Sequence, residues 1–199
     1  MAERERGSLA TLPNLLGVGR IVATPVIMVL LLADWPGSSL AGGILFVAAA
    51  LSDFLDGWIA RARNQVSPLG VFMDLAADKV LVAGVLIAMV EIGLVPTWMA
   101  ATILIREFVV QAVRQLAAVE DVVISARALG KAKTLATLAG LALLFLASDA
   151  ATGGPMRALL EAGTLEAAGF WVMVVATALT VVSGLAYLRG AWPILVGDR

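Results

Sequence analysis

The chain has 199 residues, of which 61% are hydrophobic and 15% are charged, and it contains no cysteine and no histidine. A soluble domain carries about 45–50% apolar and about 25% charged residues, so this composition excludes a water-soluble globule and a disordered chain and indicates a membrane protein. The missing residue types exclude disulfides, thiol nucleophiles, imidazole bases and the usual zinc sites, and a formal net charge of -1 gives no basic field for nucleic acid.

Six apolar segments are long enough to cross a bilayer, which takes roughly 20 residues. They are residues 12–33, 40–62, 69–90, 95–118, 129–147 and 165–188. The gaps between them are rich in turn residues and too short to separate domains. We therefore predict an all-α integral membrane protein with six transmembrane helices in a single domain, residues 1–199. Residues 1–11 mix charged and apolar side chains and are suited to lie in the membrane interface.

The basic residues are unevenly divided between the two membrane faces. When the six segments alternate in direction, one face receives every Lys and Arg except Arg157: Arg4, Arg6, Arg20, Arg61, Arg63, Lys79, Arg106, Arg114, Arg127, Lys131, Lys133, Arg189 and Arg199. The opposite face holds Asp34, Glu91, Asp149, Glu161 and Glu166. Because cytoplasmic loops carry the excess of Lys and Arg, we predict a cell-membrane protein with both termini on the cytoplasmic side.

Charged residues also lie inside the apolar segments, toward the predicted cytoplasmic ends. They are Asp53, Asp56, Asp74, Asp78, Lys79, Arg106, Glu107 and Arg114. A charged side chain costs at least a few kcal/mol at the bilayer centre and less near its edge, so this group requires compensation.

The spacing of the four aspartates indicates what compensates them. Asp53 and Asp56 are three residues apart, and Asp74 and Asp78 are four apart, so each pair lies on one face of a helix. The same faces carry the small residues Gly57, Ala60 and Gly70. The two segments are antiparallel neighbours, so the pairs can converge at a similar depth. Two divalent cations balance four carboxylates, and hard oxygen ligands favour Mg²⁺ or Mn²⁺.

Other interpretations of these residues exist. The aspartates can cap helices or pair with Arg61, Arg63 and Lys79, and the small residues can serve close helix packing. Intramembrane carboxylates also occur in ion or proton transporters, although usually near the midplane on broken helices. A structural subunit of a larger complex is a third interpretation, but it leaves the four aspartates unexplained.

The aspartates form one continuous string. It runs Asp53-x2-Asp56-Gly57-x2-Ala60-Arg61-x8-Gly70-x3-Asp74-x3-Asp78, where x is any residue. This string matches the signature of the CDP-alcohol phosphotransferase family at every fixed position, and the chain resembles that family. Residues 12–16 with Arg20 resemble its N-terminal segment. Residues 77–81, 105–107 with Arg114, and 130–134 resemble its phosphatidylglycerophosphate synthase branch.

The resemblance implies a six-helix fold, a homodimer and a divalent-metal site open to the cytosolic interface. By position, Asp53, Asp56 and Asp74 would ligate metal, and Asp78 would be shared between the second metal and catalysis. The donor, CDP-diacylglycerol, would contact Asn14, Gly57, Ala60, Arg61, Ser67 and Gly70. A carboxylate is the natural base in a chain without histidine or cysteine, and the resemblance points to Asp78. We expect direct attack of the acceptor hydroxyl on phosphorus rather than a covalent enzyme intermediate.

Basic residues in the fourth and fifth segments suggest the acceptor. Arg106, Arg114, Lys131 and Lys133 lie near the cytosolic boundary, where they can anchor and snorkel or form a pocket for a phosphate. The seven-residue spacing of Glu107 and Arg114 also allows an ion pair between them. A phosphate pocket favours glycerol 3-phosphate or inositol phosphate over serine or choline. The resemblance favours glycerol 3-phosphate.

Overall fold

The computed structural model describes residues 12–62, 68–119 and 127–196, with side chains for residues 15–52, 76–118 and 129–193. Its elements are α1 (Leu12–Leu32), α2 (Ser38–Ala62), α3 (Pro68–Glu91), α4 (Thr97–Val119), α5 (Arg127–Ala151), the 3-10 helix η1 (Pro155–Ala158) and α6 (Ala162–Val196). Each of the six predicted segments coincides with one α-helix. In this part of the chain all regular structure is helical, which confirms the predicted fold class.

Three described stretches are long and apolar enough to cross a membrane on their own. They are Leu15–Leu32, Leu129–Ala151 and Ala162–Pro193. Charged side chains interrupt the apolar character of α3 and α4, and these same side chains build the site described below. The six-helix membrane architecture therefore combines strongly apolar helices with helices whose apolar sequence is interrupted by charged side chains.

Helix α6 is longer than the sequence predicts. The predicted segment ends at residue 188, but the helix continues to Val196 and has 35 residues. At 1.5 Å per residue it is about 50 Å long, well beyond the roughly 30 Å hydrocarbon core. The extension carries Arg189 and the exposed Trp192, residue types that favour the membrane interface. Arg189, Gly190 and Pro193 interrupt the apolar run at the end of the predicted segment, but the helix continues through them.

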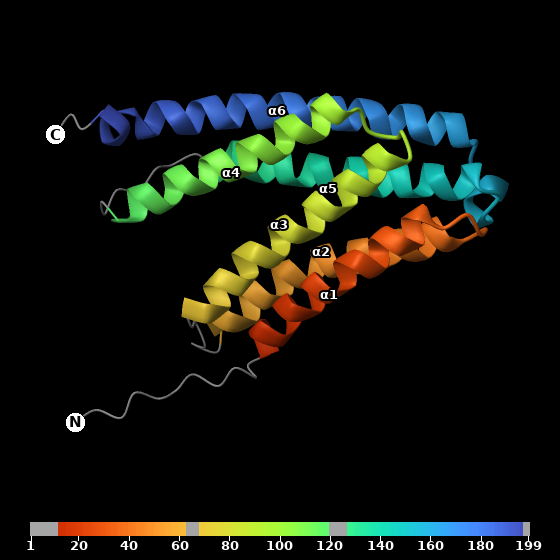
Figure 1. The fold of residues 1–199 in the computed structure, drawn as a ribbon, viewed down its shortest axis with the longest axis horizontal. Helices are drawn as coiled ribbons and strands as arrows, with labels where there is room; N and C mark the ends of the chain where they lie inside the picture. The colour runs from red at the N-terminus through yellow and green to blue at the C-terminus, as the bar shows by residue number, and fades with distance from the viewer. Residues whose placement is uncertain (1–11, 63–67, 120–126, 197–199) are drawn as a thin grey trace.

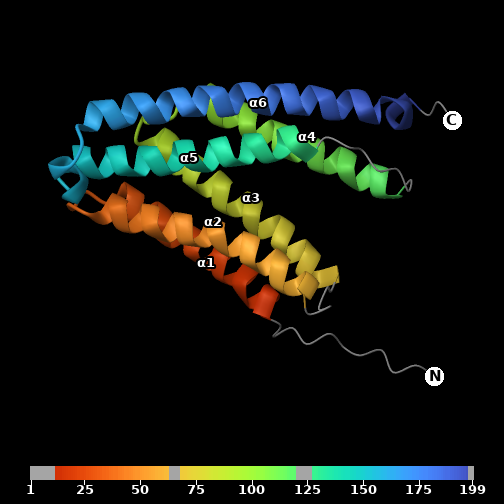
Figure 2. The same cartoon turned by 180° about the vertical axis from the view of Figure 1, so that it is seen from behind.

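The helices form two groups of three. Helix α1 packs against α2 and α3, whereas α6 packs against α5 and α4. Contacts of α2 with α5 and of α3 with α4 join the groups. Figure 1 and the reverse view in Figure 2 show the groups meeting near the α5–α6 connection. They diverge toward the end where α1 begins and α6 ends, and the predicted chemistry lies on that side.

The core lies where the two groups meet. Fully buried side chains from several helices form it, including Ile27, Phe46, Leu86, Met99, Leu141, Phe145 and Met173. Phe46 of α2 and Phe145 of α5 place their ring centroids 5.5 Å apart across the junction. Between α5 and α6, a Cβ on Gly140 would lie 2.8 Å from the Met173 sulfur. The absence of that atom allows the close helix contact that small residues give in membranes.

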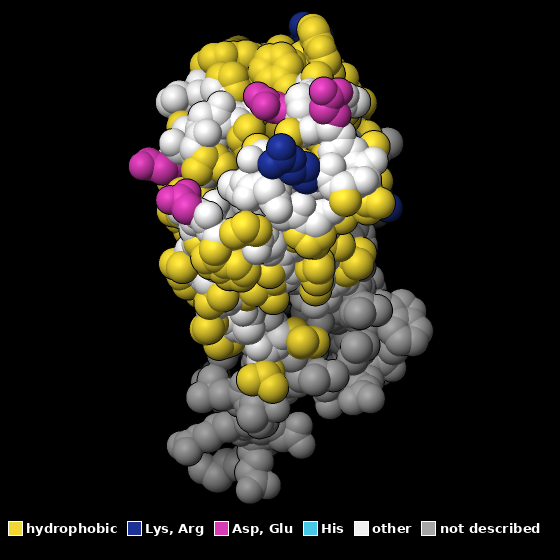
Figure 3. All heavy atoms as spheres, turned by 90° about the vertical axis from the view of Figure 1, so that its right-hand side faces the viewer, with side chains coloured by type: hydrophobic (Ala, Val, Ile, Leu, Met, Phe, Trp, Pro, Cys, Tyr) yellow, Lys and Arg dark blue, Asp and Glu magenta, His cyan; other side chains and the backbone are white. Residues whose placement is uncertain are grey.

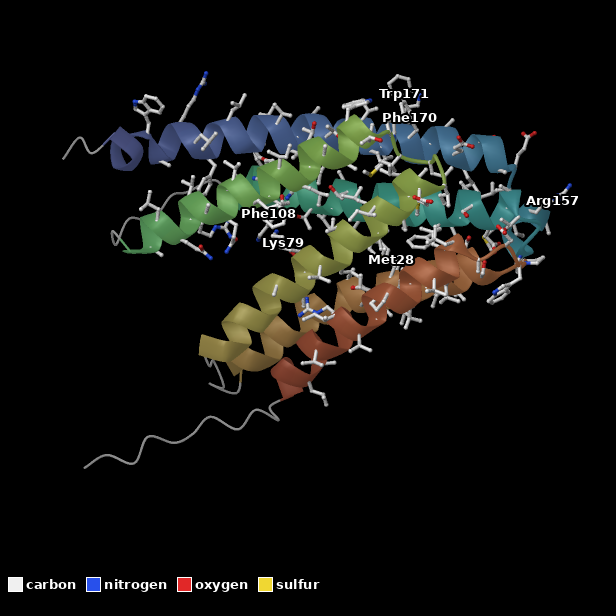
Figure 4. The ribbon with its side chains drawn as sticks, viewed as in Figure 1. Met28, Lys79, Phe108, Arg157, Phe170 and Trp171 are labelled. Carbon is white, nitrogen blue, oxygen red and sulfur yellow. The ribbon has the colours of Figure 1, made fainter. Side chains whose placement is uncertain are left out.

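The connections at the end of the bundle opposite the predicted site are short. The backbone turns at Gly37, Gly93 and Gly153, all with positive φ, a conformation that glycine adopts at little cost. Figure 3 shows this end, with separated acidic side chains and a basic group near the middle of a mostly apolar or uncharged surface. Arg157, labelled in Figure 4, lies here on η1. The position agrees with the prediction that Arg157 is separated from the other basic residues.

Candidate active site

The four predicted metal-binding aspartates lie on two helices that contact each other. Asp53 and Asp56 are on α2, and Asp74 and Asp78 are on α3. The side chains of the first three lie outside the described residues, so their convergence stays a prediction. Asp78 is described: its side chain is 39% exposed, and its Oδ2 lies 3.4 Å from Lys79 Nζ. Lys79, the alternative ion-pair partner considered for the aspartates, thus lies beside Asp78, the predicted catalytic residue.

The predicted CDP-contacting residues lie around the same helices. Ser67 lies outside the described residues. Asn14, Gly57, Ala60, Arg61 and Gly70 are placed on α1, α2 and α3 without described side chains. Their role as donor contacts stays a prediction.

Glu107 on α4 is the centre of a buried ion cluster. Its Oε1 accepts a hydrogen bond from Arg106 Nη1 at 2.9 Å and another from Lys133 Nζ of α5, and its Oε2 accepts one from Lys79 Nζ of α3. The side chains of Glu107 and Lys133 are only 10% and 8% exposed. Buried charges are tolerated when they are paired and hydrogen-bonded, and here one carboxylate serves cations from three helices.

Helix α6 holds the Arg106 side chain in place. Arg106 Nη2 donates to Ser183 Oγ at 3.1 Å. Directly beside it, a Cβ on Gly184 would come within 2.9 Å of Arg106 Cγ, so glycine leaves room for the arginine stem. Arg106 Nε is buried on the side of Gly184 and has no hydrogen-bond partner among the described residues.

A small pocket of about 40 Å³ opens beside this cluster, between α3, α4 and α5. Its polar lining comes from Asp78, Lys79, Glu107, Lys133, Thr134 and Thr137. Apolar side chains such as Phe108 and Leu138 form the rest of the wall. Figure 4 shows Lys79 and Phe108 in the region where the three helices meet. The pocket therefore joins the candidate base to a set of cations.

The structure divides the four predicted acceptor-binding residues. Arg106 and Lys133 enter the cluster. Lys131 is exposed, and Arg114 lies with its guanidinium carbon 5.7 Å from the centre of the Tyr187 ring on α6. The expected ion pair between Glu107 and Arg114 is wrong, because the described cations that pair with Glu107 are Lys79, Arg106 and Lys133. Cations on other helices approach Glu107 more closely than a residue two turns along its own helix.

Sequence reasoning assigned no site role to Lys79, Glu107, Ser183 or Gly184. The sequence did contain a signal for Lys79 and Glu107. A glutamate within an apolar segment requires a cation to pair with, and Lys79 lies within another apolar segment near the same predicted membrane face. No local signal marks Ser183 and Gly184. Their role depends on the packing of α4 against α6.

Comparison with known proteins identifies the family to which this arrangement belongs. The family described as CDP-alcohol phosphatidyltransferase matches residues 10–182. The chain belongs to the CDP-alcohol phosphatidyltransferase family. Among its curated relatives, a CDP-diacylglycerol–glycerol-3-phosphate 3-phosphatidyltransferase of Bacillus subtilis (strain 168) is 36% identical, covering 92% of this chain and 96% of the relative.

Two further relatives of the CDP-alcohol phosphatidyltransferase chain extend the comparison. A Rickettsia bellii protein with the same name as the Bacillus relative is 33% identical, covering 89% of this chain and 93% of its own. An Oryza sativa protein named cardiolipin synthase (CMP-forming) is 32% identical, covering 94% of this chain and 59% of its own. The similarity thus covers nearly the whole chain, including the helices of the ion cluster.

CDP-alcohol phosphatidyltransferases generally depend on a divalent metal ion. The donor chemistry of this chain fits one: the residues at the family positions are four aspartates, and the described one, Asp78, is partly exposed beside the pocket. Carboxylate oxygens are the ligands that Mg²⁺ and Mn²⁺ prefer. No group of three candidate ligands occurs among the described side chains, which include only Asp78 of the four.

Proposed function

We propose that this chain transfers the phosphatidyl group from CDP-diacylglycerol to glycerol 3-phosphate, producing phosphatidylglycerol phosphate and CMP. The names of the Bacillus and Rickettsia relatives support both substrates. The observation that carries the proposal is the cationic cluster of Lys79, Arg106 and Lys133, whose two lysines line one pocket together with Asp78. A pocket with that charge suits a phosphorylated acceptor better than a neutral alcohol.

In the proposed reaction Asp78 accepts the proton of the acceptor hydroxyl. The hydroxyl oxygen forms a bond to the phosphorus that carries diacylglycerol, and the bond from that phosphorus to the CMP oxygen breaks. No covalent enzyme intermediate forms. Asp78 suits this role because its carboxylate lines the pocket and remains partly exposed, so it can meet a substrate and later release the proton to water.

The same proposal assigns residues to the acceptor phosphate and to the CDP group of the donor. Lys79, Arg106 and Lys133 are proposed to bind the acceptor phosphate, and Arg114 and Lys131 are exposed cations that attract it. Arg61, with Asn14, Gly57, Ala60, Ser67 and Gly70, is proposed to hold the CDP group. Two divalent cations held by Asp53, Asp56, Asp74 and Asp78 would polarise the pyrophosphate and stabilise negative charge on the departing CMP.

The membrane orientation and assembly belong to this proposal as well. We place the protein in the cell membrane as a homodimer, with both termini and the active site on the cytoplasmic side. The segregation of Arg157 on η1 from the other basic residues supports the orientation. Because the chain lacks cysteine, an Ala158→Cys variant can be labelled at one defined, exposed position. Labelling of intact cells by an impermeant maleimide is expected, and labelling only after lysis contradicts the orientation.

A matched pair of acceptors tests the function. Purified protein is given CDP-diacylglycerol and Mg²⁺, with glycerol 3-phosphate, glycerol, inositol 1-phosphate or serine in separate reactions, and CMP release is followed. We expect rapid release with glycerol 3-phosphate and little with glycerol, which differs only by the phosphate. Chelation by EDTA is expected to stop the reaction, and excess Mg²⁺ to restore it. Faster release with inositol 1-phosphate, or with either unphosphorylated alcohol, would overturn the proposed acceptor.

A further inference from the structure

Glu107 occupies an unusual position for an acidic residue, since it lies in the pocket that is proposed to bind an anion. Both of its oxygens are used: Oε2 by Lys79, and Oε1 by Arg106 and Lys133. The three cations come from α3, α4 and α5, and Arg106 is fixed to α6 through Ser183. One carboxylate thus joins side chains of four helices at the pocket.

Electrostatics explains why the cluster needs an internal anion. Three cations close together in surroundings of low dielectric constant repel one another strongly and would separate toward water. Glu107 offsets one of the three positive charges, so the four residues retain a formal charge of +2. A phosphate monoester carries about -1.5 to -2 at neutral pH. The cluster with Glu107 in place therefore still has the charge that such a ligand neutralises.

Hydrogen-bond geometry leads to the same conclusion. An ammonium group has three N–H donors, and Glu107 uses one donor of Lys133 and one of Lys79. Arg106 lies behind the two lysines in this respect, because it does not line the pocket and its Nε is buried on the side of Gly184. Lys133 thus keeps further donors, and Lys79 keeps one beyond those used by Glu107 and Asp78; both ammonium groups line the pocket and are held in place by their bonds to Glu107.

We infer that Glu107 is a positioning residue that holds Lys79, Arg106 and Lys133 ready for the phosphate of the acceptor. This inference rests on the proposed function. Glu107 contacts neither substrate and acts through the cations. Glu107 also holds Lys79 between two carboxylates, that of Glu107 and that of Asp78. The phosphate-binding ammonium of Lys79 and the proposed base Asp78 therefore keep a constant separation.

The inference is tested by the Michaelis constants of a Glu107→Gln variant, which keeps the shape of the side chain and removes its charge. We expect the KM for glycerol 3-phosphate to rise about tenfold or more, with the KM for CDP-diacylglycerol and kcat changed far less. Glu166→Gln, an exposed residue of α6, is the matched control and is expected to behave as wild type. An equal loss toward both substrates would show a merely structural role, and an unchanged or lowered acceptor KM would show that Glu107 competes with the phosphate. Either result overturns the inference.

A Glu107→Asp variant keeps the inference testable if Glu107→Gln does not fold. It retains the charge but is one methylene shorter, so it cannot reach all three cations equally, and an intermediate rise of about threefold in acceptor KM is expected. An unchanged value in Glu107→Asp overturns the inference. The wild-type reaction separates this outcome from a failure of the proposed function. Which acceptor causes the wild-type enzyme to release CMP tests the function, whereas the ratio of the acceptor KM of the variant to that of the wild type tests the role of Glu107.

Discussion

Glu107 and Asp149 are two buried carboxylates of the same bundle with different partners. Glu107, whose side chain is 10% exposed, lies where α3, α4 and α5 meet and pairs with three cations. Asp149, fully buried near the end of α5, has no ion pair among the described residues. Its Oδ2 accepts a hydrogen bond from the Met156 backbone amide at 2.9 Å, and its Oδ1 has no hydrogen-bond partner there.

The comparison separates a carboxylate that organises a binding site from one that organises a turn. Asp149 connects the end of α5 to η1, and its backbone carbonyl also accepts a hydrogen bond from the Gly154 amide at 2.7 Å. Its partners are local and belong to the backbone, whereas those of Glu107 are side chains from other helices beside a pocket. Burial of a charged group is therefore not sufficient to indicate function. The two roles are distinguished by the charge of the partners and by whether they come from other helices or from the local backbone.

The largest expected effect contrasts two Asp→Asn variants. Asp78→Asn removes the proposed base at the pocket and is expected to lower the rate of CMP release by about a hundredfold or more, because general base catalysis contributes that much. Asp149→Asn, far from the cluster, is expected to retain turnover close to wild type. Both rates are measured with glycerol 3-phosphate on protein that elutes as a single species. A fully active Asp78→Asn enzyme contradicts the base assignment.

A second prediction tests the turn that Asp149 organises. Gly154 has φ of -73°, which alanine adopts without strain, but an added Cβ would lie 2.1 Å from Asp149 Oδ1. Gly154→Ala is expected to lower the free energy of unfolding by about 2–3 kcal/mol through overpacking. Gly163→Ala on α6, with open space around the new Cβ, is the control and should be neutral or stabilising. Thermal unfolding in detergent measures both, and equal midpoints would refute the steric argument.

A third prediction concerns the attachment of the cluster to α6. Ser183→Ala removes the hydrogen bond to Arg106 Nη2, which is worth about 1 kcal/mol, and is expected to raise the KM for glycerol 3-phosphate about fivefold. Ser39→Ala removes a buried serine hydroxyl that bonds to Ser148 at the other end of the bundle, and no change in KM is expected. Similar effects of both substitutions on the acceptor KM would mean that Ser183 does not act through Arg106.

The smallest expected effect is that of Arg114. It lies on the Tyr187 ring rather than on Glu107, and it is exposed, so its charge is screened by water. Arg114→Ala is expected to raise the acceptor KM about twofold and to leave the KM for CDP-diacylglycerol unchanged. The effect should decrease with added salt. A change larger than that of Ser183→Ala would place Arg114 in the phosphate site itself.

Much of the fold was predictable because hydrophobic segments in a membrane must be helical. Each predicted segment became a helix, and the turns at Gly93 and Gly153 lie in predicted gaps. The end of α6 was not predictable from hydrophobicity, since Arg189, Gly190 and Pro193 interrupt the apolar run and yet lie within the helix. For the site, spacing placed Asp78 and the other aspartates on helix faces, and the family assignment derived from that spacing is confirmed.

The partners of Glu107 show where sequence reasoning failed. The seven-residue spacing along α4 allowed an ion pair between Glu107 and Arg114. A side chain of a helix also faces the neighbouring helices, however, and Lys79 of α3 and Lys133 of α5 pair with Glu107 instead. Which neighbour supplies the cations depends on how α3 and α5 are placed beside α4. No spacing within α4 contains that information.

What the amino-acid sequence alone determined is a set of apolar helices, the face of each helix that carries aspartates, and membership in the CDP-alcohol phosphatidyltransferase family. These features follow from helical periodicity and from the cost of charge in hydrocarbon, both of which are local. Only the tertiary structure decided that Lys79, Arg106 and Lys133 share Glu107, and that Ser183 and Gly184 accommodate Arg106. Electrostatic pairing between helices depends on distances of a few ångströms, and packing of the whole bundle sets those distances.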